Sequence, residues 1–595
     1  MSENILIAIA WPYANAEIHV GNITGSHLPG DITARYHRLR GNQVLMVSGT
    51  DSHGTPVTIA ADKVGKTPEE VYKEYHDGFL DLFQQLGIHY DLFTTTHTAI
   101  HFKVSQSIFK ALNENGFLFT AESLQWYSPG AGRFLPDRYI EGTCYICGYD
   151  GARSDQCDKC GNVLEPEKLL NPRSKLDDST PELRPTDHFY LDLSKLEPDV
   201  MDFLRARQDY MRDTVLGESL RKIEAEGLQS RSITRDLDWG IPIPYEGWDG
   251  KCLYVWFEAV IGYLSAPVEW AAIVGRPDAW REWWTNPAAH AFYFIGKDNI
   301  FFHTALWPAE LMGVGSRFMQ IFNGEDHQQL TLPYDVPANQ FMNLEGQKLS
   351  GSRNWAVWGR DFLSRYDPDP LRYYLTIAMP ENRDTDWSWS DFLARNNNEL
   401  VATWGNLVNR VLSFAYKHWD GLVPTPGDLR PGDQEILAAV ESGFETVGSY
   451  YEAVKLRAAL GETMRLATEA NRYLDTAAPW KEIKTDKQAS ATTLYTAMRV
   501  IDSLKVLFAP ILPFSSERLH ATLGYERPLF GKQVVEEHTD DLGSHHALRY
   551  LPQEASGRWQ ASNLVPGKPF HKPEPLFRKL DDEIVEAERA RLGEE

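Results

Sequence analysis

A short apolar run at residues 5–10 leads into a His-x-Gly turn at residues 19–21, and a helical pattern follows over about 23–40. A strand, a turn and a helix in this order place backbone amides and an imidazole at a helix N-terminus, where phosphate oxygens bind well. A second buried strand is predicted at 43–48, and an amphipathic helix with a 3.6-residue apolar period at 68–87. This alternation predicts an α/β fold with a parallel sheet that binds ligands at the carboxyl ends of its strands.

The composition is that of a globular protein with several structural units. The chain has 595 residues, of which 43% are hydrophobic and 18 are tryptophan, so more than one core is expected. No apolar run reaches the ~18–20 residues of a membrane span, and the first residues do not resemble a signal peptide. We therefore expect a cytoplasmic protein without membrane contact. The net charge of −24 argues against broad, salt-driven binding of nucleic acid, but it allows a folded RNA recognised through its shape and unpaired bases.

The N-terminal half is predicted to contain one sheet domain with an insertion. Residues 1–117 and 233–330 alternate between strand-like and helix-like runs, and we expect them to be the two halves of a Rossmann-like domain. Residues 118–232 are rich in Gly, Pro and Asp, and they read as an insertion that ends with a charged helix at about 201–228. Strand-like runs then resume, at residues 252–256 and 291–296.

The C-terminal half is predicted to be mostly helical. Residues 331–390 form a mixed connector, residues 391–530 a helical bundle and residues 531–595 a tail. The tail combines a loose Pro/Gly/His segment with a charged helix near 581–592. The clearest helices of the bundle are expected at 398–418, 433–452 and 454–473.

Four of the five cysteines form two close pairs, Cys144 with Cys147 and Cys157 with Cys160. Each Cys-x-x-Cys pair can give two thiolates to one tetrahedral ion, and four sulfur ligands form a closed, structural Zn²⁺ site. The insertion is thus expected to contain a zinc knuckle at residues 144–160, and the small number of cysteines is typical of a reducing compartment. Unrelated thiols or a redox pair are the alternative. The fifth cysteine, Cys252, is expected in the core.

A second polar turn, at residues 348–352, combines lysine, serine and glycine. Alone it would be ordinary loop chemistry. Together with the turn at 19–22, it resembles the paired signatures of class I aminoacyl-tRNA synthetases. Further segments match methionyl-tRNA synthetases in the same order, and the resemblance extends to about residue 530; these segments are Trp-Pro-Tyr-Ala-Asn at 11–15, Asp-Ser-His-Gly-Thr-Pro at 51–56, Tyr254 to Tyr263, and Gly296-Lys297-Asp298 followed by Phe302-His303 and Trp307-Pro308.

The resemblance implies that ATP, with Mg²⁺, activates methionine as an adenylate. His19, Asn22 and Lys348 would stabilise the charge that builds on the phosphates, with no need for a protein nucleophile. Two positions depart from the family pattern: Asn22 replaces a histidine, and Gly351 stands where a second lysine is usual. Arg353 is a candidate for the missing charge. The full set of implied ATP-binding residues is His19, Gly21, Asn22, Lys297, Lys348, Leu349, Ser350 and Ser352.

The resemblance also implies a methionine pocket in which Asp51 holds the α-ammonium group. A thioether is polarizable and packs well against aromatic edges. For each aromatic residue alone, plain core packing is the competing interpretation. The implied pocket residues are Ala10, Trp11, Tyr13, Asp51, Trp256, Ala259, Tyr263, His303 and Trp307. Val260, where the family often has proline, reads as a neutral packing change.

In the helical region the resemblance implies an anticodon-binding domain that uses Asn406, Arg410 and Trp480. Asn406 and Arg410 are one helical turn apart, so both can address one base edge, and Trp480 offers a stacking surface for an unpaired base. The implied partners are methionine, ATP and initiator and elongator tRNA(Met). The tail is too short for an added dimerisation module, so a monomer is expected.

Two other classes of function stay open on the sequence. One is a synthetase for Leu, Ile, Val or Cys, or a simpler nucleotidyltransferase with similar phosphate chemistry. The insertion is too short for an editing domain, no catalytic zinc set is seen in the sheet domain, and a nucleotidyltransferase would not need the helical region. The other class is a non-enzymatic RNA-binding zinc protein, which would show no amino-acid-dependent pyrophosphate exchange.

Overall fold

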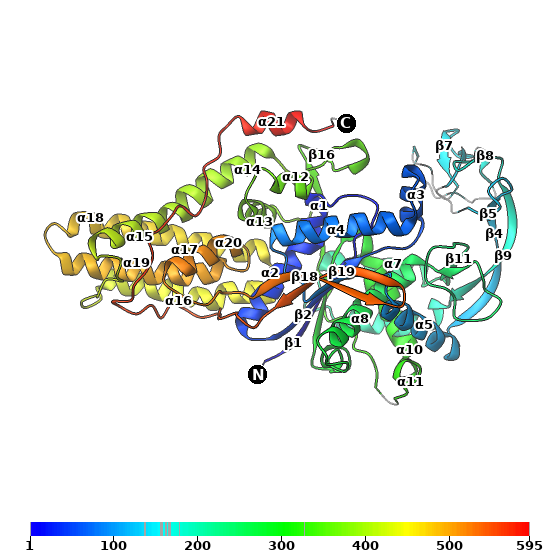
Figure 1. Ribbon diagram of the computed structural model, residues 1–595, viewed down its shortest axis with the longest axis horizontal. Coiled ribbons are helices and arrows are strands. Elements are labelled where there is room, and N and C mark those ends of the chain that lie inside the picture. The colour runs from blue at the N-terminus through cyan, green and yellow to red at the C-terminus, as the bar shows by residue number, and fades with distance from the viewer. Residues whose placement is uncertain are drawn as a thin grey trace.

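The computed structural model describes residues 2–593 except 136–138, 155–156, 158, 161–163, 165–167, 178 and 326–327. Its centre is a seven-stranded sheet in the order β14-β13-β1-β2-β3-β19-β18 (Figure 1). The first five strands in this order are parallel, as the alternation of strands and helices predicts. Their bounds are β14 Ala338–Asn339, β13 His290–Gly296, β1 Asn4–Ile9, β2 Gln43–Thr50 and β3 Leu92–Thr95.

The predicted helix after the first strand is continuous but changes its pitch. It consists of α1 (Val20–Asn22), a π-helical segment η1 (Ile23–His27) and α2 (Leu28–Arg40). A second π segment, η6 (Phe302–Leu306), precedes α10 (Trp307–Val314). π segments often mark functional sites because they shift side chains relative to a regular helix. The other helices that cover the sheet include α4 (Pro68–Leu86) and α5 (Ala99–Glu114), and α3 (Thr55–Val64) packs on α4.

The strand expected at residues 252–256 is mostly wrong. Only Cys252–Leu253 forms a strand (β12), and it pairs with β11 (Thr234–Arg235) outside the main sheet. Helix α8 (Val255–Ile273) begins directly afterwards and is buried over most of its surface. A helix buried on all sides has a continuous apolar sequence, which over a few residues cannot be told from a buried strand.

The insertion is built around a long antiparallel ribbon of β4 (Leu118–Ser128) and β9 (Glu182–Leu191). At its far end lies a small sheet of β7 (Asp150–Arg153), β6 (Ile140–Thr143) and β8 (Leu170–Ser174). Figure 1 shows this part at the opposite end of the molecule from the helical bundle.

The single charged helix expected at 201–228 is two helices, α6 (Glu197–Arg205) and α7 (Asp213–Glu226). The break between them is used for tertiary hydrogen bonds. Arg207 donates to the carbonyl oxygen of Pro333 at 2.8 Å, and Arg212 to that of Ala338 at 3.0 Å. These long-range contacts fix the break between the two helices. No local sequence pattern predicts such contacts.

The connector forms a small sheet and two helices beside the main sheet. Its strands are β15 (Met342–Leu344), β16 (Gln347–Lys348) and β17 (Thr385–Trp387), and its helices are α12 (Gly359–Leu363) and α13 (Pro368–Ile377). The turn between β15 and β16 comes immediately before the Lys348 loop. The loop is therefore carried by a short hairpin.

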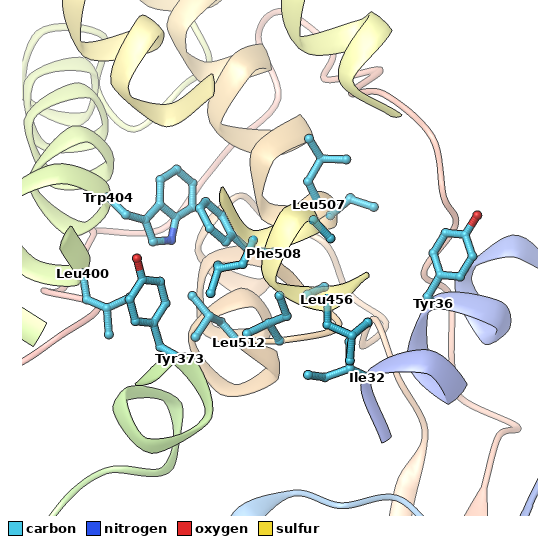
Figure 2. Packing of buried hydrophobic residues seen from close by; sticks show 14 of the residues in the cluster. Ile32, Tyr36, Tyr373, Leu400, Trp404, Leu456, Leu507, Phe508 and Leu512 are labelled. Atoms are coloured by element: carbon cyan, nitrogen blue, oxygen red, sulfur yellow. The ribbon is translucent and has the colours of Figure 1, made fainter. Parts of the chain in front are cut away.

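The predicted helical bundle is present. Its helices are α14 (Trp389–Arg395), the π segment η8 (Asn396–Gly405), α15 (Asn406–His418), α16 (Pro431–Glu452), α17 (Leu456–Ala477), α18 (Pro479–Glu482), α19 (Lys487–Phe508) and α20 (Pro513–Thr522). Figure 2 shows Trp404 and Phe508 of the bundle in one core with Ile32 and Tyr36 of α2. The bundle and one face of the sheet thus share a hydrophobic core.

The tail differs most from its prediction, because its expected loose segment is a β-hairpin. Strands β18 (Lys532–Asp540) and β19 (Gly543–Leu551) pair with each other, and β19 joins β3 antiparallel at Leu548 and Phe93. Leu548 is fully buried. The chain then returns along the bundle to a terminal helix α21 (Ile584–Ala590), shorter than the expected 581–592 (Figure 1).

Candidate active site

A cavity of about 480 Å³ lies at the carboxyl ends of β1, β2 and β13. Residues at or just beyond the end of each of these strands line it: Ala10 and Trp11 after β1, Asp51 after β2, and Gly296 at the end of β13. Parallel sheets open ligand sites at this edge. The cavity also brings together the two polar turns that lie more than three hundred residues apart in the sequence.

His19 and Asn22 cap the helix that begins at Val20. The His19 Nδ1 atom accepts hydrogen bonds from the backbone N–H groups of Gly21 at 3.1 Å and Asn22 at 3.3 Å, and Asn22 Oδ1 accepts from the His19 N–H at 3.1 Å. Because Nδ1 is an acceptor, the ring proton is assigned to Nε2. Burial lowers the pKa of His19 to about 4. The ring is therefore a neutral donor at the pH of a cell.

The loop after Lys348 is docked on the first turn. Val20 N–H donates to the Val357 carbonyl and Gly359 N–H to that of Ile18, both at 2.9 Å. At Gly21, an added β-carbon would lie only 2.8 Å from the Leu349 side chain. A side chain at position 21 would therefore crowd both the Leu349 side chain and the His19 ring, which explains the glycine.

The lysines of the site have different surroundings. Lys348 lines the cavity, with its Nζ 5.4 Å from the Phe341 ring centroid. Lys297 does not line the cavity; its Nζ lies 3.9 Å from the same ring centroid and 2.7 Å from an oxygen of Asp384. Leu349 lines the cavity, whereas Ser350 is held through its backbone, with its N–H 2.9 Å from the Trp355 carbonyl oxygen.

Of the two departures from the family pattern, Asn22 lines the cavity and Gly351 does not. A β-carbon at Gly351 would lie 3.0 Å from the Trp358 ring, so a larger residue there would have to move that ring. Arg353 is exposed. The Ser352 side chain lies outside the described part of the structure.

Eight of the nine residues expected in the amino-acid pocket line the cavity: Ala10, Trp11, Tyr13, Asp51, Trp256, Ala259, Tyr263 and His303. The Trp11 ring has room because two neighbouring positions are glycine. A β-carbon at Gly49 would lie 2.2 Å from the ring, and one at Gly262 would lie 2.6 Å from it. Trp307 is fully buried behind Tyr263 and does not line the cavity, which agrees with its packing interpretation.

Asp51 is 2% exposed, and its Oδ1 atom has no hydrogen-bond partner within the described structure. Its backbone is fixed on both sides, with its N–H donating to the Pro12 carbonyl at 2.8 Å and its carbonyl accepting from Ala14 at 3.1 Å. Burial, and then the charge of Glu258, raises the pKa of Asp51 well above its usual value. A buried carboxylate oxygen without a partner is costly, and a cationic ligand group would supply the partner.

The part of the pocket around Tyr263 and His303 is polar but uncharged. His303 Nδ1 faces the Asn299 carbonyl oxygen at 2.9 Å, so it carries the proton, and Nε2 accepts from the Tyr263 hydroxyl at 2.8 Å. Burial lowers the pKa of His303 to about 4. This wall suits a neutral, polarizable ligand group.

The cavity also includes residues that sequence reasoning did not assign. They are Pro12, Gly25, Ser26, His27, Val260, Gly296, Asp298, Asn299, Gln340, Phe341 and Met342. Asp298 and Gly296 lie in the Gly-Lys-Asp motif, which was a detectable signal. Gly25, Ser26 and His27 come from the π segment η1, which no sequence pattern indicated.

The four paired cysteines meet in the small sheet of the insertion. Their Sγ atoms all lie within 4.8 Å of one another, with Cys144–Cys160 at 4.0 Å and Cys147–Cys157 at 3.6 Å. A tetrahedral Zn²⁺ with bonds of about 2.3 Å requires sulfur separations of about 3.8 Å, so the arrangement fits such an ion. Parts of the expected knuckle, residues 155–156 and 158, lie outside the described residues. Cys252 is buried, as expected.

In the bundle, Arg410 and Trp480 lie together. The Arg410 guanidinium is 5.3 Å from the Trp480 ring centroid and also reaches Asn471 at 3.0 Å and Asp475 at 3.1 Å. Asn406 is exposed one turn earlier on α15, and Trp480 is half-buried. The three expected residues therefore share one part of the bundle surface. They are far in the sequence from the residues that line the cavity.

Comparisons with known proteins identify the family of the chain. The model of the family described as tRNA synthetases class I (M) matches residues 5–412, and that of the anticodon binding domain of methionyl tRNA ligase matches residues 423–554. The methionine–tRNA ligases of Thermomicrobium roseum and Chloroflexus aggregans are 51% and 52% identical to the chain, and each alignment covers 100% of it and 99% of the relative.

A solved structure of methionyl-tRNA synthetase from Mycobacterium tuberculosis, in complex with methionyl-adenylate, superposes with a TM-score of 0.74. It is 25% identical in sequence, and the match covers 97% of this chain and 100% of that one. The fold is thus that of a class I aminoacyl-tRNA synthetase. Within that class, the chain belongs to the family of methionine–tRNA ligases.

Proposed function

We propose that the cavity at the sheet edge makes methionyl-adenylate from methionine and ATP, and that the methionyl group then passes to the 3′-terminal adenosine of tRNA(Met). The observation that carries this proposal is the one cavity that joins the turns at residues 19–22 and 348–352, the Asp51 Oδ1 atom without a partner among the described residues, and the uncharged side chains of Tyr263 and His303.

In the first step a methionine carboxylate oxygen attacks the α-phosphorus of ATP, and the bond from that phosphorus to the bridging oxygen breaks to release pyrophosphate. His19 Nε2–H, the Asn22 amide and Lys348 would stabilise the charge on the phosphates. The loops around ATP would be shaped by Gly21, Leu349, Ser350 and Ser352. Lys297 would contact ATP from its position beside Asp384. Asp51 would bind the α-ammonium, while Tyr263 and His303 would contact the thioether end.

Two metals belong to the proposal. Cys144, Cys147, Cys157 and Cys160 would hold one structural Zn²⁺ that completes a small sheet with a small core of its own. Mg²⁺ would enter with the ATP phosphates and neutralise part of their charge.

The division of labour along the chain is also a proposal. Residues 1–117 and 233–330 would form the catalytic domain, 118–232 would lie near the acceptor end of the tRNA, 331–390 would carry the ATP loop, and 391–530 would bind the anticodon through Asn406, Arg410 and Trp480. The tail from 531 would pack on the rest of the same chain, since β19 pairs with β3 and α21 packs against α14. This internal use of the tail supports a monomer.

A cytoplasmic location follows from the proposed role, because charged tRNA is consumed at ribosomes. Across the described residues, no helix is both long and apolar enough to cross a bilayer.

Amino-acid-dependent exchange of labelled pyrophosphate into ATP, measured across the twenty amino acids, tests the proposal. We expect exchange with methionine alone. Exchange with leucine, isoleucine, valine or cysteine would assign a different synthetase, and no exchange with any amino acid would leave only an RNA-binding protein.

A further inference from the structure

We propose that the C-terminal segment 581–593 positions the loop that carries Lys348, and that Glu588 is the main positioning residue. The inference rests on the proposed function, because the loop is assigned there to the ATP phosphates. It concerns residues that lie far from the cavity in the sequence and outside both matched family regions.

Glu588 is a buried carboxylate with three donors on the connector. It is 4% exposed, and its two oxygens accept from the Arg365 guanidinium at 2.8 Å and 2.9 Å. The Tyr366 hydroxyl donates to it at 2.8 Å. A two-point guanidinium–carboxylate pair of this kind fixes orientation as well as distance.

The same segment reaches both ends of the Lys348 loop. On one side, Arg589 contacts Glu345 in the turn before β16 at 3.0 Å. On the other side, the Gly593 N–H donates at 3.0 Å to the carbonyl of Asn354, directly after the loop. A loop tied at both ends samples fewer conformations than one held at a single end.

The residues just before this segment are anchored to the bundle. Asn397 exchanges two hydrogen bonds with the Leu580 backbone, at 2.9 Å and 3.0 Å, and Asn396 donates to the Arg578 carbonyl at 3.1 Å. Figure 1 shows the chain leaving the bundle and laying α21 beside α14, near the connector. The position of the loop is therefore tied to the helical bundle as well as to the sheet.

This geometry has a kinetic consequence. The first turn and the Lys348 loop must be placed together around the phosphates, and small errors in placement cost large factors in rate. Loss of the Glu588 contacts should therefore slow adenylation by disturbing the placement of ATP. The methionine pocket should be unchanged, because it is built from the sheet and α8.

The test compares Glu588→Ala with Glu583→Ala, a matched change at an exposed position beside the same helix. In Glu588→Ala we expect methionine-dependent pyrophosphate exchange to fall roughly ten- to hundred-fold, with a raised KM for ATP. Methionine binding, followed by tryptophan fluorescence, and the thermal midpoint should stay close to those of the unaltered protein. Glu588→Gln, which keeps an acceptor oxygen, should recover part of the activity.

Hydrogen exchange gives a second readout, with faster exchange expected across residues 345–355 in Glu588→Ala and in Arg589→Ala. An unchanged rate of pyrophosphate exchange in Glu588→Ala would overturn the inference. An equal loss of pyrophosphate exchange in Glu583→Ala would overturn it as well. An equal loss of methionine binding would also overturn it, because it would indicate general damage. If the unaltered protein shows no methionine-dependent exchange, the proposed function itself fails.

Discussion

At the scale of single residues, the local backbone determines which ring nitrogen of His19 carries the proton. Burial and the two N–H donors on Nδ1 keep the ring neutral, with a pKa of about 4. We expect no step near pH 6.5 from His19 in pyrophosphate exchange, and NMR of the His19 ring should show a midpoint below pH 5. Between pH 6.5 and about 4 the unfolded chain binds this proton and the folded one does not, so His19 lowers the free energy of unfolding as the pH falls. A His19 titration near 6.5 would contradict the assigned hydrogen bonds.

Lys348 is the charged residue that the second turn contributes to the cavity. Lys348→Ala should slow adenylate formation by roughly 2–4 kcal/mol of transition-state stabilisation. Methionine affinity should hardly change, because the lysine addresses phosphates. Single-turnover adenylation measures the step directly. A normal rate in the variant would mean that the turn is only a surface loop and that Gly351 marks a decayed site.

Gly262 is needed because the Trp11 ring occupies the space of a side chain. Gly262→Ala should displace that ring and weaken methionine binding, since the added carbon would lie 2.6 Å from it. Equilibrium methionine binding measures the effect. Gly461→Ala is the control, because position 461 is also helical and has open space around it. Equal affinity in both variants would show that Trp11 has freedom to move.

At the scale of elements, the small sheet of the insertion packs on a cluster of only nine buried hydrophobic residues in the described chain, and two of them are cysteines. Chelation of the metal, or Cys157→Ser, should therefore loosen residues near 140–165 and impair aminoacylation, and leave the bundle folded. Hydrogen exchange and far-UV circular dichroism follow the two effects. Well under one zinc per chain in freshly purified protein would count against the site.

At the scale of the whole molecule, the cavity proposed for adenylation and the bundle surface proposed for the anticodon are separate parts of one folded unit. Trp480→Ala should reduce tRNA charging by about 1–3 kcal/mol, the range for one lost aromatic stack, and spare pyrophosphate exchange. The defect should disappear with a minimal acceptor-stem RNA, which has no anticodon.

The shared core makes the opposite result informative. Arg372 joins the two parts, reaching Asp31 of α2 at 2.6 Å and the Ile511 carbonyl at 2.8 Å. If Trp480→Ala lowers pyrophosphate exchange as much as charging, then Trp480 is a packing residue whose loss is transmitted through this core, and the anticodon assignment fails.

Much of this architecture could be predicted from local patterns. Local signals, each within a few residues, exist for the first two strands, the helix after each turn, the main bundle helices and the two Cys-x-x-Cys pairs. The errors share one cause. The start of α8 and the hairpin β18–β19 are decided by what surrounds them, since a buried helix resembles a strand and a sheet edge accepts strands from anywhere in the chain.

By itself the sequence determined which side chains this protein has for chemistry: the His-x-Gly and Lys348 turns, the lone Asp51 and the four thiols. It also determined that a strand precedes the first turn, because the period of apolar residues is a local property. Only the tertiary structure decided that Trp307 lies behind the pocket and that Lys297 sits beside Asp384. It alone brought the chain's last described residues to the Lys348 loop. Contacts between residues hundreds of positions apart depend on how whole elements pack, and no short-range pattern encodes that packing.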